Sequence, residues 1–379
     1  MEIANPYDRI GHSTTTIVVS QHGDGDCVTI TEALHRAAEM REHNGNGMVL
    51  RRVAERPTIE PITIRIRPGV YRERVEVTLP HIALIGDDPR TTTIVLGLGA
   101  RMPANASTIG NTDDGTADST IGNTNDSTPL GTFRTYTMLV DADHVTLRNL
   151  TIANDAGDGR DVGQAIALYA DGDELLVESC RILGHQDTLF TGPLPPKELQ
   201  QGGFIGPKQF APRRVGRQWY RQCLIAGDVD FIFGGATAMF EDCEIRSLNR
   251  DMDVNGYVTA ASTPEGRVYG YVFRGCRFTD DGCAPGSVYL GRPWRDFARV
   301  ALVDCELGAH IHPDGWWDWD KPRAHDGSRL SGLGLHGPGF DPNCWPDWTL
   351  PNDPAGLAWY SPEHVLGEAG MTVGGPDER

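Results

Sequence analysis

One short sequence frame recurs along the central part of this chain and constrains its fold more than any other feature. The frame reads apolar, polar, variable, cysteine, variable, apolar, and its five cysteines are Cys180, Cys223, Cys243, Cys276 and Cys305. Residues 147–152 form a sixth copy, in which we predict that Asn149 takes the place of the cysteine. The copies follow one another at intervals of 20 to 43 residues. Such a repeat indicates a solenoid whose coils carry loops of variable length.

The alternation of apolar and polar residues around each copy predicts short strands with one face turned inward. We therefore predict an all-β, single-stranded solenoid, the parallel β-helix, in one domain over residues 1–379. The amphipathic stretch 29–42, with Thr31 as its candidate N-cap, is predicted to be a short helix that covers the N-terminal end of the solenoid. The segment beyond Gly337 is rich in Pro, Gly and Trp, and we expect it to wrap the outside of the coils.

The repeated cysteines are expected to stack in the core as small hydrophobic side chains. No C-x-x-C pair suggests a structural zinc site, so no metal is predicted. A row of free thiols fits a reducing compartment, and the N-terminal stretch lacks a basic start followed by an apolar segment. We expect a cytoplasmic protein, with secretion as the alternative.

The charge balance and hydropathy limit the kinds of partner. The chain has 52 acidic and 34 basic residues, a net charge of −18, whereas a nucleic-acid binder normally carries a basic stripe. No uninterrupted apolar run approaches the roughly 18 residues that a membrane span needs. Residues 101–130 are rich in Ser, Thr, Asn, Asp and Gly and contain Ser-Thr-Ile-Gly-Asn-Thr twice, at 107–112 and 119–124. We predict that this segment is an exposed loop excursion.

Two aspartates are candidates for chemistry because each lies in an otherwise apolar context. Asp187 follows Cys180 by 7 residues, and Asp230 follows Cys223 by 7 residues, so the solenoid is predicted to place both at the same edge of nearby coils. Buried carboxyl groups are costly and are therefore usually paired or functional. Two carboxyl groups in one cleft can have their pKa values pushed apart, which leaves one ionised and the other protonated.

Three further polar residues extend this candidate site. Arg292 lies between apolar and aromatic residues, where a guanidinium needs a carboxylate partner, and Asp230 is the partner we predict. Gln164 and Gln186 are uncharged amide donors of the kind that stabilise a developing oxyanion. Asn, Gln and Asp also form purely structural ladders in β-helices, so each residue alone is a weak signal and only the set carries weight.

Five short segments resemble motifs of the pectin methylesterase (pectinesterase) family and occur in the family's order. They are G-x-Y-x-E at 69–73, G-Q-A-x-A-L at 163–168, Q-D-T-L at 186–189, D-F-I-F-G at 230–234 and L-G-R-P-W at 290–294. Looser similarity at 131–134 and 311–316 extends the resemblance over most of the chain. The resemblance implies a right-handed parallel β-helix and the hydrolysis of C6 methyl esters of galacturonate in pectin, without a metal or cofactor.

The resemblance also implies roles for individual residues. Asp230, oriented by Arg292, would be the nucleophile, and Asp187 would be the general acid and then the general base. Gln164 and Gln186 would stabilise the tetrahedral oxyanion. The sugar units would lie against five residues, namely Trp294, Phe233, Phe190, Thr132 and Val229. Trp316, Trp317 and Trp319 would either add a wall to this groove or cover the core.

The chain departs from common members of this family in the long gap between Asp187 and Asp230. Residues 192–217 form a Pro/Gly-rich insertion that we expect beside the cleft. Its five basic residues suggest the hypothesis that it attracts the free carboxylates of partly demethylated oligogalacturonate; they are Lys197, Lys208, Arg213, Arg214 and Arg217. With no secretion signal visible, we expect an intracellular, bacterial-type, monomeric enzyme that acts on imported methyl-esterified oligogalacturonate rather than on polymeric pectin.

Two other classes of function stay open at this level. A polysaccharide lyase or glycosidase can share the β-helix, although a lyase needs acid clusters for calcium and a glycosidase needs two acids spaced about 6.5–9.5 Å apart if it inverts. A catalytically silent, carbohydrate-binding β-helix is the second alternative. Release of methanol separates the esterase from both.

Overall fold

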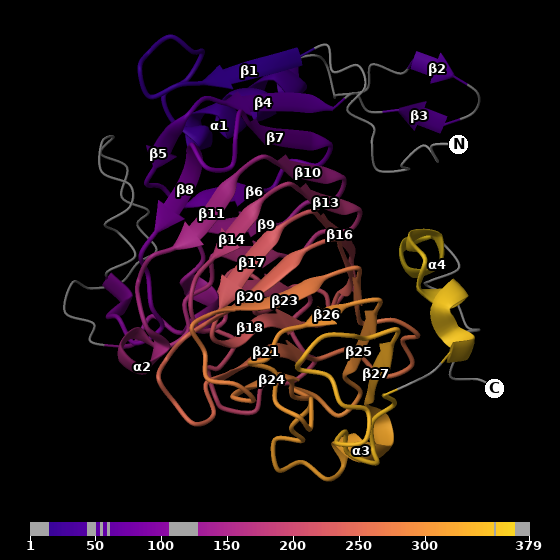
Figure 1. Ribbon diagram of the computed structural model, residues 1–379. Coiled ribbons are helices and arrows are strands. Elements are labelled where there is room, and N and C mark those ends of the chain that lie inside the picture. The colour runs from indigo at the N-terminus through magenta and orange to yellow at the C-terminus, as the bar shows by residue number, and fades with distance from the viewer. Residues whose placement is uncertain are drawn as a thin grey trace.

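The computed structural model describes residues 15–43, 51–53, 56–58, 61–105, 128–351 and 354–367. In these residues, three parallel sheets run side by side along one stack of coils, with the N-terminal coils at one end and the C-terminal coils at the other (Figure 1). A complete coil contributes one strand to each sheet, and successive coils pair in parallel. The predicted all-β parallel β-helix is confirmed.

The strands of the three sheets have short and regular bounds. The ten-stranded sheet contains β1 (Thr15–Val19), β4 (Ile62–Ile66), β7 (Ile82–Gly86), β10 (Val145–Arg148), β13 (Leu175–Glu178), β16 (Arg217–Arg221), β19 (Thr237–Glu241), β22 (Tyr271–Arg274), β25 (Arg299–Val303) and β27 (Arg329–Leu333). The eight-stranded sheet contains β5 (Gly69–Tyr71), β8 (Thr92–Leu96), β11 (Thr151–Asn154), β14 (Arg181–Leu183), β17 (Leu224–Gly227), β20 (Glu244–Leu248), β23 (Arg277–Asp281) and β26 (Glu306–Leu307). The seven-stranded sheet contains β6 (Val75–Val77), β9 (Met138–Val140), β12 (Leu168–Ala170), β15 (Leu189–Thr191), β18 (Val229–Gly234), β21 (Gly256–Ala261) and β24 (Val288–Gly291). An antiparallel pair, β2 (Arg51–Val53) and β3 (Arg56–Thr58), stands apart from them.

The cysteine frame marks the corner between the ten-stranded and the eight-stranded sheets. Its five cysteines are buried free thiols in the main core, as predicted. The prediction for Asn149 is wrong by one residue. The registers align Arg148 with Glu178 and Thr151 with Arg181, so Leu150 takes the place of Cys180 in the core.

Asn149 instead occupies the corner position just before the core residue, with a φ of 56°. The equivalent residues of the following coils share this left-handed conformation; they are Ser179, Gln222, Asp242, Gly275 and Asp304. Asn and Asp tolerate positive φ better than other non-glycine residues, because their short polar side chains can form local hydrogen bonds. The polar character of this position therefore belongs to the turn and not to the core.

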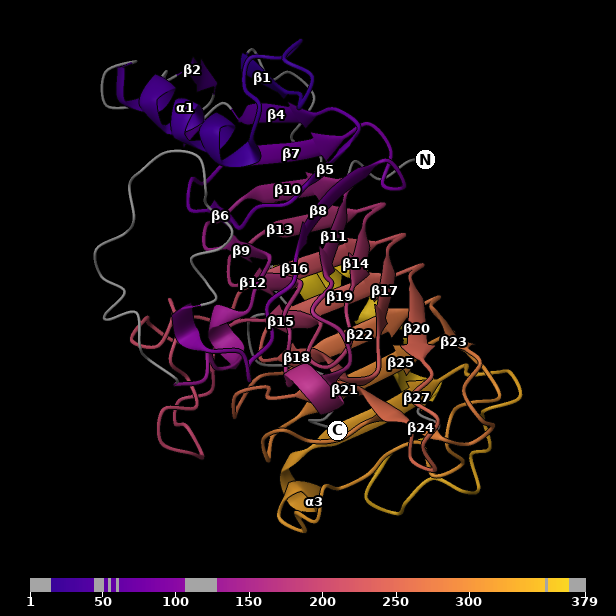
Figure 2. The same ribbon diagram turned by 90° about the vertical axis from the view of Figure 1, so that its left-hand side faces the viewer.

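A helix covers the N-terminal end of the solenoid, as predicted (Figure 2). This helix, α1 (Ile30–His43), packs against β1, β4 and β6. Its N-cap is Thr29 and not Thr31, because the Thr29 hydroxyl accepts a hydrogen bond from the backbone N–H of Glu32 at 3.1 Å. Thr31 donates its own hydroxyl to Glu73, whose carboxylate also accepts the backbone N–H of Ile30 at 2.9 Å. Glu73 thus ties the first helix to the coil below it.

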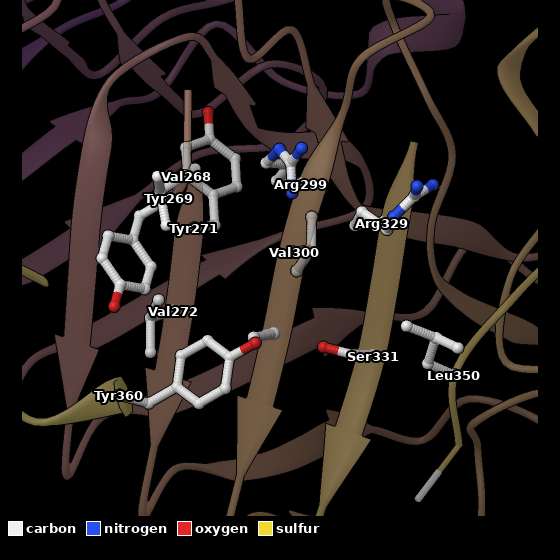
Figure 3. A pocket seen from close by; sticks show the side chains of 12 residues that line it. Val268, Tyr269, Tyr271, Val272, Arg299, Val300, Arg329, Ser331, Leu350 and Tyr360 are labelled. Carbon is white, nitrogen blue, oxygen red and sulfur yellow. The ribbon is translucent and has the colours of Figure 1, made fainter. Parts of the chain in front are cut away.

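Residues 354–366 lie against the outer face of the ten-stranded sheet, as predicted for the segment beyond Gly337, whereas Phe340, Trp345 and Trp348 of the same segment pack against the main core. The segment contains η4 (Pro354–Tyr360) and α4 (Pro362–Leu366), whose Val365 and Leu366 are buried against side chains of this sheet. Figure 3 shows the narrow pocket that remains there, between Tyr360 and the strands that carry Tyr271, Val300 and Ser331. Across the described ranges, no helix is long and apolar enough to cross a membrane.

The polar excursion at 101–130 can be followed only at its two ends. The backbone N–H of Leu130 donates to Met102, and that of Ala104 donates to Thr128, so the excursion leaves and rejoins the coil at one place. The twelve-residue repeat within it lies outside the described residues.

Candidate active site

The outer face of the seven-stranded sheet carries an aromatic layer. Leu168, Leu189 and Ile232 form one inward-facing row of this sheet, and the next residue on each strand points outward. The outward residues of the same three strands are Tyr169, Phe190 and Phe233. The sheet therefore has an aliphatic inner face and an aromatic outer face, and the candidate catalytic residues lie where these strands begin.

The two candidate aspartates lie on adjacent coils at this edge, as predicted. Asp187 precedes β15, and Asp230 lies in β18, where the pairing with β21 shifts register between Val229 and Ile232. Both residues have positive φ, 65° for Asp187 and 50° for Asp230. The backbone N–H of Asp187 donates to Val229 at 3.0 Å. A bulge re-aims a side chain, and here it lies at Asp230.

Arg292 is the partner of Asp230, as predicted. Its Nε donates to Asp230 Oδ1 at 2.8 Å and its Nη2 donates to Oδ2 at 2.7 Å, which is the bidentate geometry. Aromatic rings enclose the guanidinium, whose carbon lies 3.9 Å from the ring centre of Tyr257, 3.7 Å from that of Trp319 and 5.4 Å from that of Trp317. These rings fix the plane of the guanidinium and hence the orientation of the carboxylate.

The two carboxyl groups differ in their electrostatic surroundings. Burial raises the pKa of Asp187 well above its ordinary value, and the charge of Asp230 raises that pKa further. Burial also raises the pKa of Asp230, but the charge and hydrogen bonds of Arg292 oppose this effect. Because only Asp230 holds the guanidinium directly, the site favours an ionised Asp230 beside a protonated Asp187.

Gln186 directly precedes Asp187, and Gln164 lies on the coil before it. The backbone N–H of Ala165 donates to the carbonyl of Gln186 at 3.0 Å, and both glutamines are half-buried. Within the described part of the chain, neither side-chain amide has a hydrogen-bond partner. Their N–H groups are therefore available to an oxyanion.

The sequence reading missed the support of Gln186 by α2 (Gly159–Val162). A Cβ atom at Gly159 would lie 2.6 Å from Oε1 of Gln186 and 2.7 Å from its Cβ. We expect Gly159→Ala to displace the Gln186 amide and lower kcat about 10- to 100-fold, since loss of one oxyanion donor costs about 10²–10³. Asp161→Ala, an exposed change on the same helix, is the control. Turnover of Gly159→Ala at the level of the control would contradict this role.

Two of the predicted sugar-binding residues are not accessible. Phe190 is 0% exposed and Phe233 is 4% exposed, so neither presents a ring face to a ligand. The reason is that other aromatic side chains cover them. Trp294, Thr132 and Val229 are partly exposed, and their predicted role stays open.

The tryptophans predicted to form a wall or a cover have two different places. Trp316 is buried in the main core, where its ring meets that of Trp345. Trp317 and Trp319 pack on Arg292 instead. Trp316 therefore covers the core, whereas Trp317 and Trp319 are partly exposed, and for these two a wall of the groove stays a prediction.

The structure adds an ion pair that the sequence reading did not single out. His185 Nδ1 lies 2.9 Å from Asp228 Oδ2, and the two residues stand two positions before Asp187 and Asp230. Asp228 is 1% exposed, and the backbone N–H of Val229 donates to it at 2.7 Å. Asp228 lies between apolar neighbours like Asp230, which is the signal that could have found it. This pair ties together the two turns that carry the carboxylates.

Lys321 is a second residue that the sequence reading missed. Burial, with the nearby charges of Arg292 and Arg295, lowers the pKa of Lys321 to about 8. Its Nζ lies 3.9 Å from the ring centre of Trp319, the same ring that packs on Arg292. No motif marks this position, because it reaches the site only through the fold.

The fold and the site together define a parallel β-helix protein with a pair of buried carboxyl groups, an arginine clamp and two free amide side chains. Comparison with known proteins shows to which family of β-helix proteins the chain belongs. The family model for pectinesterase matches residues 100–193 and 213–349. The chain belongs to the pectinesterase family.

Individual relatives agree with this assignment. The chain is 32% identical to pectinesterase 1 of Citrus sinensis over 265 residues, 68% of this chain and 37% of the relative. It is 29% identical to pectinesterase QRT1 of Arabidopsis thaliana over 326 residues, 84% of this chain and 68% of the relative. A pectin methylesterase solved in complex with a hexasaccharide has a TM-score of 0.67 and 25% identity, covering 96% of this chain and 100% of its own. The chain spans only 35–43% of the length of three other plant relatives.

Proposed function

We propose that this chain is a carboxylic ester hydrolase that removes C6 methyl esters from galacturonate units of pectin or its oligosaccharides and releases methanol. The observation that carries the proposal is the bidentate pair of Arg292 and Asp230 beside the buried carboxyl group of Asp187. Membership in the pectinesterase family supports the choice of ester.

The site can perform the reaction in two steps. An oxygen of Asp230 attacks the ester carbonyl, and the tetrahedral oxyanion accepts hydrogen bonds from Gln164 and Gln186. As the C–O bond to the methoxy group breaks, Asp187 gives its proton to the departing oxygen, and methanol leaves.

The acyl-enzyme anhydride is then hydrolysed. Asp187, now ionised, takes a proton from the attacking water, and a second tetrahedral species releases the galacturonate carboxylic acid and the Asp230 carboxylate. Arg292 holds that carboxylate in place for the next turnover, and Asp187 has recovered its proton.

The direct test is the release of methanol from highly methylated pectin and from short methylated oligogalacturonates. We expect release from at least one of the two substrates. A folded protein that releases no methanol from either would contradict the proposal and favour a carbohydrate-binding solenoid.

The pH dependence tests the role of Asp187. Burial and the charge of Asp230 raise the pKa of Asp187 well above its ordinary value, so its protonated form persists to higher pH than that of an ordinary aspartate. Activity is expected to fall as the pH rises through that raised pKa. Asp187→Asn is expected to lower kcat about 10²–10⁴-fold and to remove this alkaline fall. Asp242→Asn changes an exposed aspartate that also has positive φ, and it is expected to keep the wild-type profile. An unchanged alkaline limb in Asp187→Asn would assign the titration to another group.

The compartment and the oligomeric state stay predictions. All eight cysteines are free thiols, which supports the expectation of a reducing compartment inside the cell. Fractionation of the native host cells tests the compartment. The molecular mass of the protein in solution tests the oligomeric state.

A further inference from the structure

The insertion at 192–217 interrupts the match to the family model. The pectinesterase model matches up to residue 193 and again from residue 213, so residues 194–212 lie outside the match. The insertion joins β15 of the seven-stranded sheet to β16 of the ten-stranded sheet. It therefore begins at the end of β15, the strand that follows Asp187.

One side chain of the insertion lies on the aromatic layer of the seven-stranded sheet. The ring centre of Phe204 is 5.7 Å from that of Phe133 and 6.3 Å from that of Trp294. Phe204 is 6% exposed, and Phe133 in turn lies 5.0 Å from Phe190. Phe204 thus contacts both Trp294 and Phe133, and Phe133 directly follows Thr132 in the sequence. Thr132 and Trp294 are two of the residues against which sugar units were expected to lie.

Ion pairs fix the insertion in this place. Its Lys208 pairs with Asp141 and, at 3.3 Å, with Asp171. Arg214 pairs with Asp143. The sequence Asp-x-Asp occurs in two successive coils, at 141–143 and 171–173, and supplies these carboxylates.

Two further basic residues of the insertion, Arg213 and Arg217, also have partners. Arg217 pairs with Asp173 at 2.7 Å, and Arg213 donates to four backbone carbonyls around the loop. At the other end of the sheet face, Arg295 donates to the carbonyl of Lys197 at 2.8 Å. The hypothesis that this basic cluster attracts free carboxylates of the substrate is therefore wrong for Lys208 and Arg217, whose largely buried charges anchor the loop instead. The Arg214 side chain is 60% exposed, and for this residue the hypothesis stays a prediction.

We propose that the insertion shortens the sugar-binding surface and that Phe204 is a residue that determines substrate length. A long galacturonate chain would need ring area on the outer face of the seven-stranded sheet, and Phe204 occupies that area. The site then takes methyl esters near a chain end, as in short oligogalacturonates, in preference to esters in the interior of polymeric pectin. This inference rests on the proposed function and adds the substrate length to it.

The test compares Phe204→Ser with Phe210→Ser. Phe210 belongs to the same insertion but is 91% exposed, so its removal controls for the change of residue type. For each protein, kcat/KM per methyl ester is measured on methylated trigalacturonate and on highly methylated polymeric pectin. We expect wild type and Phe210→Ser to favour the trimer, and Phe204→Ser to reduce that preference at least about fivefold, as exposed aromatic area becomes available.

Two outcomes overturn the inference: a wild-type preference for the polymer, or a length preference in Phe204→Ser equal to that of Phe210→Ser. If Phe204→Ser does not fold, Lys208→Gln with Arg214→Gln releases the anchor and is expected to shift the preference in the same direction. Binding of short and long de-esterified oligogalacturonates, measured by calorimetry, repeats the comparison without turnover. A protein that binds with the expected length dependence but releases no methanol would contradict the proposed function and leave this inference standing.

Discussion

Asp230→Asn is expected to abolish methanol release, with kcat reduced about 10⁴–10⁶-fold, the range seen when a nucleophile or its partner is removed. The amide cannot form the anhydride with the substrate, and it cannot accept both hydrogen bonds that Arg292 donates at 2.7–2.8 Å. Methanol release under single-turnover conditions is the measurement, because it also detects a slow first step.

Asp304→Asn is the matched control for this change. Asp304 has a φ of 51°, close to the 50° of Asp230, but it is exposed at a corner of another coil. Both variants therefore place Asn in the same backbone conformation. Equal activity of the two would mean that Asp230 is not the nucleophile.

Arg292→Gln is expected to have the largest effect on stability and to move the pH profile. The change leaves Asp230 as a buried carboxyl group without its cation, and breaking a buried pair in this way costs about 3–5 kcal/mol. Because the charge of Arg292 opposes the effect of burial, its loss raises the pKa of Asp230 further. The acid limb of kcat/KM is therefore expected to move to higher pH.

The pH dependence of stability follows from the same shift. A carboxyl group whose pKa is higher in the folded than in the unfolded protein stabilises the fold below the unfolded value, and this contribution is lost as the pH rises through the folded pKa. The deficit of Arg292→Gln relative to wild type is thus expected to grow with rising pH in thermal unfolding. A deficit that shrinks as the pH rises would contradict the assigned pairing.

Arg221→Gln controls for the loss of an arginine with the same types of contact. Arg221 pairs with Glu178 at 3.0 Å, and its guanidinium carbon lies 5.0 Å from the ring centre of Trp219. It lies on the ten-stranded sheet, away from the carboxylate pair. Because its side chain is 29% exposed, its loss is expected to cost less stability and to leave the pH profile in place.

Much of the candidate site was readable from the sequence because the solenoid converts sequence offsets into positions. Asp187 and Asp230 follow their cysteines by the same number of residues, so repetition alone predicted that they share an edge. The apolar neighbours of Asp230 and Arg292 predicted their pairing, since buried opposite charges need each other. Such arguments failed where a shift of one residue along the chain moves a side chain from the core to a turn. Asn149 was placed one position off because a polar residue at a tight corner resembles a polar residue in a ladder.

The sequence by itself determined the repeat and the parallel β-helix, which follow from periodicity, and it predicted the pairing of Asp230 with Arg292, which follows from the cost of burying a charge. Gln164 and Gln186 were predicted through the family resemblance. Only the tertiary structure decided which surfaces stay open. Phe190 and Phe233 have the residue type of a sugar platform, yet Phe204 and its neighbours cover that face. Lys208 has the residue type of a substrate anchor, yet Asp141 and Asp171 already hold it. Exposure and pairing depend on what the rest of the chain brings to a side chain, and contacts between distant segments are not written in any local pattern.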